Sequence, residues 1–472
     1  MEYDPFLFVD VAHPTWLLYV ALLILAVFFR FSRLLSVRNL DLLLILLVST
    51  ALVVTASSQH AVTEFGGDIA QQENPVYAWS SVVLLALSVL LIFRLIFDEG
   101  LTRRPRLEQN LNHAGLAFLC VPAFAILMTS VFVVEPPGGN VAAVESGKAL
   151  LQRQAIKDST ATDDQEHPAP TETLLAAGAT TVAELSGGID ATAVNADSRS
   201  TPIEQTIARS LVVVAHTLVI LGLVYIGRNH FNSLQLGISM SCLYLLLPCT
   251  AFKVHELSHV LPAACLTWAF ACYRRPAVAG VLLGLACGTL FFAVFLLPLW
   301  AVFYGRRGSI RFGMSLGIVA AIVLFTVAMT SSDTDSFLNR LVQTANWTVY
   351  RLFSDTPPGS GNGIGEIFLR ITLSSVFFLM LTAMIVIPRK RNLENLLANS
   401  TALVVAAQLW YPEDVGTYVL WYLPLLLLVM FRPRLDRFTP PEIQNGNFTT
   451  RPKPATVQTG GSGPLSRVTL HH

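Results

Sequence analysis

The sequence predicts an all-α fold, a polytopic bundle of transmembrane helices. Of its 472 residues, 53% are hydrophobic and only 13% are charged, whereas soluble domains carry about 25% charged residues. Apolar runs long enough to cross a bilayer, about 20 residues each, recur along most of the chain. Lys plus Arg and Asp plus Glu balance at 31 each, so the net charge indicates no nucleic-acid partner. The expected partner is the membrane lipid bilayer.

The apolar runs place about thirteen helices along the chain. Charged residues, Gly, Pro or Asn separate consecutive runs, as expected at helix ends. In chain order we expect helices at 15–30, 39–56, 78–97, 114–134, 208–227, 232–251, 256–273, 276–289, 291–304, 311–330, 367–387, 394–411 and 416–431.

The distribution of basic residues predicts the orientation of these helices. The short loops 57–77 and 412–415 contain no Lys or Arg. By the positive-inside rule these loops lie outside, and the basic connections lie in the cytoplasm. We therefore expect an outside N-terminus and a cytoplasmic C-terminus. The basic connections hold Arg30, Arg33, Arg38, Arg103, Arg104, Arg106, Arg228, Arg274, Arg275, Arg306, Arg307, Arg311, Arg389, Lys390, Arg391, Arg432 and Arg434.

The apolar run 276–304 is expected to cross the membrane twice. The pair Arg274–Arg275 precedes this run and the pair Arg306–Arg307 follows it. A single crossing would place one of the two pairs outside, against the positive-inside rule. Two short helices that meet in a bend near Gly288–Thr289 keep both pairs on the same side.

The chain divides into four regions. Residues 1–134 hold the N-terminal transmembrane helices, and 208–437 form the transmembrane core. The connection 135–207 is rich in Ala, Thr, Ser, Gly and Asp, and we expect a long extracytoplasmic loop that is largely disordered or only locally helical. The Pro-, Gly-, Ser- and Thr-rich segment 438–472 predicts a disordered cytoplasmic tail. Apolar residues at helical spacing predict an external amphipathic helix near 336–353.

The stretch HELSH, residues 255–259, matches the H-E-x-x-H pattern of zinc proteases. Four residues apart on one helix, His255 and His259 could chelate a metal, with Glu256 as general base. No later span carries an acidic residue in its interior to complete the site, so we predict no metal and disfavour an intramembrane metalloprotease. Two interpretations stay open. The stretch is either a hydrated helix N-terminus, where Glu256 favours the positive dipole end, or a substrate site without zinc.

The segment Leu245–Arg307 carries a family resemblance. It holds Arg274-Arg275-Pro276, and Ala279, Gly280, Gly284, Leu285, Ala286, Thr289, Leu297 and Pro298 follow in a matching order. With this pattern it resembles the GT-C membrane glycosyltransferases, particularly the polyprenyl-phosphate-mannose-dependent enzymes of glycosyltransferase family 87. The later stretches Trp410-Tyr411-Pro412 and Trp421-Tyr422-Leu423-Pro424 resemble the last two helices of that family. The likeness is weaker over 208–431 as a whole.

This resemblance implies a membrane glycosyltransferase of the GT-C fold. Such an enzyme would transfer a mannose-like sugar from a polyprenyl-phosphate donor to an acceptor outside the cytoplasm. The lipid-linked sugar would be its partner, and no cofactor would be needed because the donor already carries the activated sugar. The implied location is the bacterial plasma membrane, where the chain would be an integral membrane protein.

The resemblance also implies a carboxylate on the outside that deprotonates the acceptor hydroxyl. In the loop 57–77, Asp68 follows the flexible Gly66-Gly67 and is the preferred base, with Glu64 second. The donor phosphate would need hydrogen-bond donors or cations on the same side. The candidates for substrate binding are His255, Glu256, His259, Arg340 and Arg351, with Lys253 beside them.

Two positions depart from the family pattern. Leu290 stands where that family has Lys, and Ala293 stands where it has Pro. The Lys of the family would meet the donor phosphate at the outer bend. Its replacement leaves a second function open, namely a catalytically inactive protein of the GT-C fold that acts as a scaffold or lipid binder.

Overall fold

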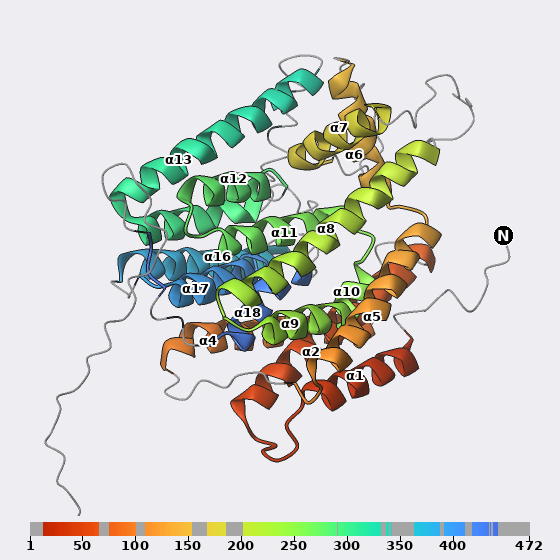
Figure 1. Ribbon diagram of the computed structural model, residues 1–472, viewed down its shortest axis with the longest axis vertical. Helices are drawn as coiled ribbons and strands as arrows, with labels where there is room; N and C mark the ends of the chain where they lie inside the picture. The colour runs from red at the N-terminus through yellow and green to blue at the C-terminus, as the bar shows by residue number, and fades with distance from the viewer. Residues whose placement is uncertain are drawn as a thin grey trace, which may run out of the picture.

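The computed structural model describes most of the chain as helices (Figure 1). Among the described residues, which contain no β-strand, five helices are long and apolar enough to cross a membrane and seven apolar helices are shorter. The protein is therefore a helical membrane protein. The described residues are 13–65, 75–100, 109–152, 168–185, 202–289, 291–331, 337–338, 341, 363–387, 391–410, 418–433, 435 and 438–441.

The N-terminal region forms helices at the predicted positions. Within a bilayer the backbone can satisfy its hydrogen bonds only inside a helix or a closed barrel, so long apolar runs become helices. Along the chain, α2 packs against α4, and α5 packs against the later helix α9. The elements are α1 (Pro14–Phe28), α2 (Val37–Phe65), α4 (Pro75–Ile96), the short 3-10 helix η1 (Phe97–Gly100) and α5 (His113–Val133).

The connection 135–207 contains two packed helices, α6 (Gly138–Leu151) and α7 (Pro170–Leu185). This part of the predicted extracytoplasmic loop is thus helical in these two segments. Their small residues let the backbones approach closely, because a Cβ on Gly147 would lie 2.6 Å from the Ala177 nitrogen. Both helices also pack on α8 and α13 (Figure 1). The amino-acid composition did not predict this helix packing, since Ala, Gly and Thr occur both in disordered segments and at close helix contacts.

The central region contains the segment that carries the family resemblance. The predicted helix 232–251 is divided at Pro248, because Pro cannot donate the backbone hydrogen bond that would continue α9. Leu247 accordingly adopts an extended conformation. The elements are α8 (Pro202–Asn229), α9 (Leu234–Leu246), α10 (Pro248–Phe252), α11 (Leu257–Ala271), α12 (Pro276–Cys287), the 3-10 helix η2 (Phe291–Leu296) and α13 (Leu297–Thr330).

The chain reverses direction twice after α11. It turns at Gly288–Thr289, as predicted. It turns again at Gly305 inside α13, where φ is +65°. The segments before and after Gly305 run antiparallel. The evidence is the hydrogen bond that the Ser309 hydroxyl donates to the Ala301 carbonyl, eight residues earlier in the chain. The Tyr304 hydroxyl donates to the Tyr273 carbonyl over 2.7 Å. This bond places the pairs Arg274–Arg275 and Arg306–Arg307 at the same end of the helices, as the sequence predicted.

The last two of the three C-terminal helices form the centre of the bundle. The three helices are α16 (Gly363–Val386), α17 (Leu393–Ala407) and α18 (Val419–Phe431). Every residue of α17 and α18 is buried, and for α18 this is expected because the helix is apolar on all sides. In Figure 1, α18 lies among α9, α11 and α17, and it packs against all three. Most of the predicted external helix 336–353 and the tail from 442 onward lie outside the described residues.

Candidate functional site

Three of the predicted site residues lie in the described part of the chain with their side chains. Asp68, Arg340 and Arg351 lie outside the described residues, and so does Leu290. Glu64 is in the last turn of α2, but its side chain is not among those described. His255, Glu256 and His259 all lie at the start of α11, and the structure adds Lys253 to them.

HELSH does not form the helix that a zinc-protease motif requires. Glu256 is the N-cap residue of α11, and the helix begins at Leu257. His255 therefore precedes the helix and cannot share a helical face with His259. No three His, Cys, Asp or Glu side chains are grouped for a metal ion within the described residues. The geometric basis of the metalloprotease alternative is absent.

Glu256 joins two basic side chains at the start of α11. Its Oε1 accepts a hydrogen bond from Lys253 Nζ at 2.8 Å, and its Oε2 lies 2.8 Å from His259 Nε2. The Lys253 and His259 side chains are 12% and 10% exposed, whereas that of Glu256 is 29% exposed. We call these three residues the 253–259 cluster. An ammonium has three N–H donors, so Lys253 retains two for water or a ligand.

Asn140 of α6 takes over the capping role at this helix start. Its Oδ1 accepts from the Leu257 N–H at 3.3 Å, and its Nδ2 donates to the His255 carbonyl at 2.7 Å. The first N–H groups of a helix need such partners, which the N-cap side chain usually supplies. Glu256 makes no capping hydrogen bond. Its carboxylate is thereby free to hold the two basic groups.

A buried His–Tyr pair on α8 and α9 also supports the turn at 253–256. The Nε2 of His216, on α8, lies 3.1 Å from the Val254 carbonyl oxygen, and its Nδ1 lies 3.0 Å from the Tyr244 hydroxyl on α9. A carbonyl oxygen only accepts, so Nε2 carries the proton and Nδ1 accepts from the tyrosine. The turn at 253–256 is thus held by α6, α8 and α9 together.

The electrostatics keep Glu256 ionised. Burial of its carboxyl raises the pKa, but the hydrogen bond and charge of His259 and the charge of Lys253 outweigh burial and lower the pKa to about 2. For His255, burial lowers the pKa of the imidazole, Glu256 opposes this, and Arg209 lowers the pKa further. At neutral pH Glu256 is therefore a weak base and His255 is neutral. Glu256 is therefore unsuited to abstract a proton, and the cluster offers a ligand the remaining N–H donors of Lys253.

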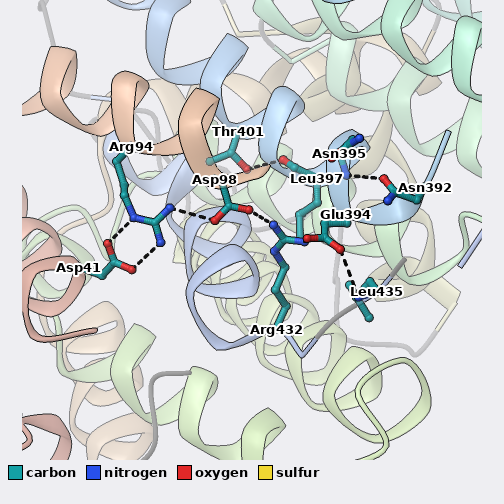
Figure 2. Close-up of polar contacts among 10 residues, drawn as sticks. All are labelled: Asp41, Arg94, Asp98, Asn392, Glu394, Asn395, Leu397, Thr401, Arg432 and Leu435. Carbon is teal, nitrogen blue, oxygen red and sulfur yellow. Dashed lines mark hydrogen bonds and ion pairs between the residues drawn. The ribbon is translucent and has the colours of Figure 1, made fainter. Parts of the chain in front are cut away.

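A second polar assembly lies at the C-terminal end of α18 (Figure 2). Arg94 of α4 binds both carboxylate oxygens of Asp41 on α2 at 2.8 Å, and it donates to Asp98 of η1 at 2.9 Å. Arg432, just after α18, pairs with Asp98 and also lies 2.9 Å from Glu394 of α17. We call these five residues the arginine network.

The arginine network joins the two ends of the sequence. α18 has 13 residues and is therefore about 20 Å long, with Tyr418 beside His259 at its start and Arg432 at its other end. The network thus lies far from the 253–259 cluster. The sequence analysis missed it, although one signal was present. Arg94 and Asp41 lie within apolar spans, where an ionised side chain requires a partner.

Comparisons of the chain with protein-family models, curated proteins and solved structures found no significant match.

Proposed function

We propose that this protein is an integral membrane glycosyltransferase of the GT-C type. It transfers a mannose-like sugar from a polyprenyl-phosphate donor to an acceptor outside the cytoplasm. The observation that carries the proposal is the 253–259 cluster, in which a carboxylate holds Lys253 and His259 at the start of α11. This helix lies within Leu245–Arg307, the segment whose residues resemble family 87, so the anion-binding groups and the resemblance meet in one place.

The cluster supplies what a phosphate leaving group requires. As the acceptor oxygen attacks the anomeric carbon, the bond from that carbon to the phosphate oxygen breaks and the polyprenyl phosphate leaves with the electron pair. Lys253 offers its two remaining N–H donors to this developing charge, and His259, whose Nε2 faces Glu256, would offer an N–H at Nδ1 only in its protonated form. Lys253 would thereby take the place of the Lys that the family has where this chain has Leu290. Arg340 and Arg351 are the further candidates for this role.

The acceptor must lose a proton during the transfer. A positioned carboxylate is suited to take it, and Glu256 is not suited because its pKa is about 2. Asp68, from the connection between α2 and α4, remains the preferred base, and Glu64, from the last turn of α2, is the second. The acceptor proton would pass to this carboxylate as the new glycosidic bond forms.

The proposed topology follows the basic residues. We infer thirteen crossings, with the N-terminus outside and the C-terminus in the cytoplasm of a bacterial plasma membrane. Three contacts support one common basic end. Tyr304 binds the Tyr273 carbonyl, His230 bonds to the Ala271 carbonyl, and Arg274 lies over the Phe438 ring. In this arrangement the 253–259 cluster lies at the outer end of the bundle.

The decisive experiment measures turnover of a lipid-linked sugar. The purified protein in lipid nanodiscs is incubated with polyprenyl-phosphate mannose and a membrane extract as the source of acceptor, and the release of polyprenyl phosphate is followed. We expect release by the wild type, and at least a hundredfold lower release by Asp68→Asn. Glu73→Gln changes another carboxylate of the same loop and is the matched control.

The second function, an inactive scaffold or lipid binder, is favoured by Leu290. It makes a different prediction for the same preparation. Polyprenyl-phosphate mannose would bind and raise the melting temperature of the protein, but no polyprenyl phosphate would be released. Absence of both binding and turnover with mannose, glucose and galactose donors would contradict both functions.

A further inference from the structure

Three deeply buried polar side chains near the 253–259 cluster have polar atoms without hydrogen-bond partners. They are Thr250 of α10, Gln408 at the end of α17 and Tyr422 of α18, which are 0%, 2% and 1% exposed. Within the described part of the chain, the two hydroxyl groups and both polar atoms of the Gln408 amide make no hydrogen bond of normal geometry. Buried polar groups are almost always hydrogen-bonded, since leaving one unpaired is unfavourable. Three together indicate a partner from outside the chain.

The three side chains belong to one location. The Tyr422 hydroxyl lies within hydrogen-bonding reach of the Gln408 amide, and it is also close enough to feel the charge of the Cys249 thiol, the neighbour of Thr250 in the chain. The helices that carry them also pack together, α17 on α18 and α10 on α18. The groups therefore face a common region where α10, α17 and α18 meet.

Two separate helices place this region one turn from the 253–259 cluster. On α10, Thr250 precedes Lys253 by three residues. On α18, Tyr422 follows Tyr418 by four residues, and the Tyr418 ring stacks on His259 with centroids 5.2 Å apart. Residues three or four apart lie on the same helical face, about 5 Å along the axis. Lys253 of the cluster, just after α10, and Tyr418, which stacks on His259 just before α18, thus each have a polar side chain about one turn away, Thr250 and Tyr422.

We propose that Thr250, Gln408 and Tyr422 form a subsite for the sugar ring of a lipid-linked hexose, while the 253–259 cluster holds the phosphate of the same molecule. This inference rests on the proposed function and names the part of the ligand that each group receives. The three side chains offer both donors and acceptors. A sugar ring fits this set because each of its hydroxyl groups can donate and accept.

The test compares two lipids that differ only in the sugar. Binding of polyprenyl-phosphate mannose and of sugar-free polyprenyl phosphate is measured on the full-length protein in nanodiscs. For the wild type we expect tighter binding of the sugar-bearing lipid. Gln408→Leu and Tyr422→Phe should each weaken binding of that lipid by about tenfold, the equivalent of one hydrogen bond, and leave sugar-free lipid binding unchanged.

Ser400→Ala is the matched control. Ser400 is a fully buried serine on α17 whose hydroxyl also lacks a partner in the described structure. It lies eight residues before Gln408, about 12 Å away along the helix. This variant should bind both lipids as the wild type does. Melting curves of the ligand-free variants verify that each one is folded.

Each remaining outcome counts against a particular statement. Equal binding of the two lipids by the wild type, or unchanged binding by both subsite variants, would overturn the sugar subsite and leave water as the partner of these groups. If the wild type binds neither lipid, the proposed function fails, and methyl α-mannoside at millimolar concentration becomes the probe. Stabilisation by this sugar that both variants lose would preserve the subsite alone, and no stabilisation would overturn it as well.

Discussion

Glu256 organises its neighbours at the residue scale because another residue caps its helix. Asn140 binds the backbone on both sides of Glu256, and the carboxylate then holds Lys253 and His259. A short motif suggested zinc chelation, yet the same residues form an ion-pair cluster. Whether such residues can chelate zinc or form an ion-pair cluster depends on where the helix begins. A motif of five residues does not specify the start of the helix.

Asn140 should be essential for the shape of this turn. Asn140→Ala leaves the Leu257 N–H and the His255 carbonyl without their partner, and a lost buried hydrogen bond costs about 1–3 kcal/mol. We expect a lower melting temperature and faster hydrogen exchange at 253–258. Asn229→Ala, at the exposed last residue of α8, is the control. Unchanged exchange at 253–258 would contradict the capping role.

The ionisation of Glu256 predicts a pH dependence. Its pKa falls from 4.5 in the unfolded chain to about 2 in the folded protein, so the folded state binds fewer protons between these values. The stabilisation is therefore present in full above about pH 4.5 and is lost as the pH falls toward 2. The difference in melting temperature between wild type and Glu256→Gln should be constant from pH 5 to 6.5 and shrink below pH 4. A difference that grows on acidification would refute this assignment.

At the scale of elements, the sequence predicted the positions of the helices well, but it predicted only some of the turns between them. Each predicted helix has a counterpart, from 15–30 at α1 to 416–431 at α18. Apolar length is a local property, so it can be counted along the chain. The predicted helix 232–251 ran through Pro248, whereas the structure ends α9 before this residue, which lacks the N–H that would continue the helix. The packing of α6 on α7 could not be predicted from the sequence, since it depends on which small residues meet.

Gly305 offers a test of the second reversal in α13. Its φ of +65° is unfavourable for a residue with a Cβ, by about 1–2 kcal/mol. Gly305→Ala should therefore lower the melting temperature of the purified protein. Gly313→Ala lies on the same helix with no atom within 4 Å of the added Cβ, and it should be neutral or slightly stabilising. Equal effects of the two substitutions would show that the reversal does not need glycine.

At the scale of the whole molecule, the arginine network fastens the first helices to the last. Asp98 and Arg432 are 334 residues apart in the chain, and Asp41 and Arg94 are 53 apart. Buried ions of this kind stabilise a structure only as a complete set, because each one is costly to bury alone. The network therefore favours the single arrangement in which α2, α4, α17 and α18 meet at this end.

Removing one member of the arginine network should therefore destabilise the protein strongly. Arg94→Ala leaves Asp41 buried without its bidentate partner, and breaking such a pair costs about 3–5 kcal/mol. We expect a large fall in the melting temperature, measured by tryptophan fluorescence, and partial recovery when Asp41→Asn is added. Arg228→Ala removes an exposed arginine at the end of α8 and should have little effect. A melting temperature as high as that of the control would mean that the network contributes no stability.

The sequence by itself determined that this is a helical membrane protein, where its helices lie, and that Arg274–Arg275 and Arg306–Arg307 share one end. Hydrophobic length and charge spacing are local, and the bilayer acts on them directly. The tertiary structure decided which polar groups meet. Asn140 reaches Leu257, His216 supports Val254, and Arg432 reaches Asp98. Each of these contacts joins different helices, so it exists only once the bundle has closed and has excluded water from the groups.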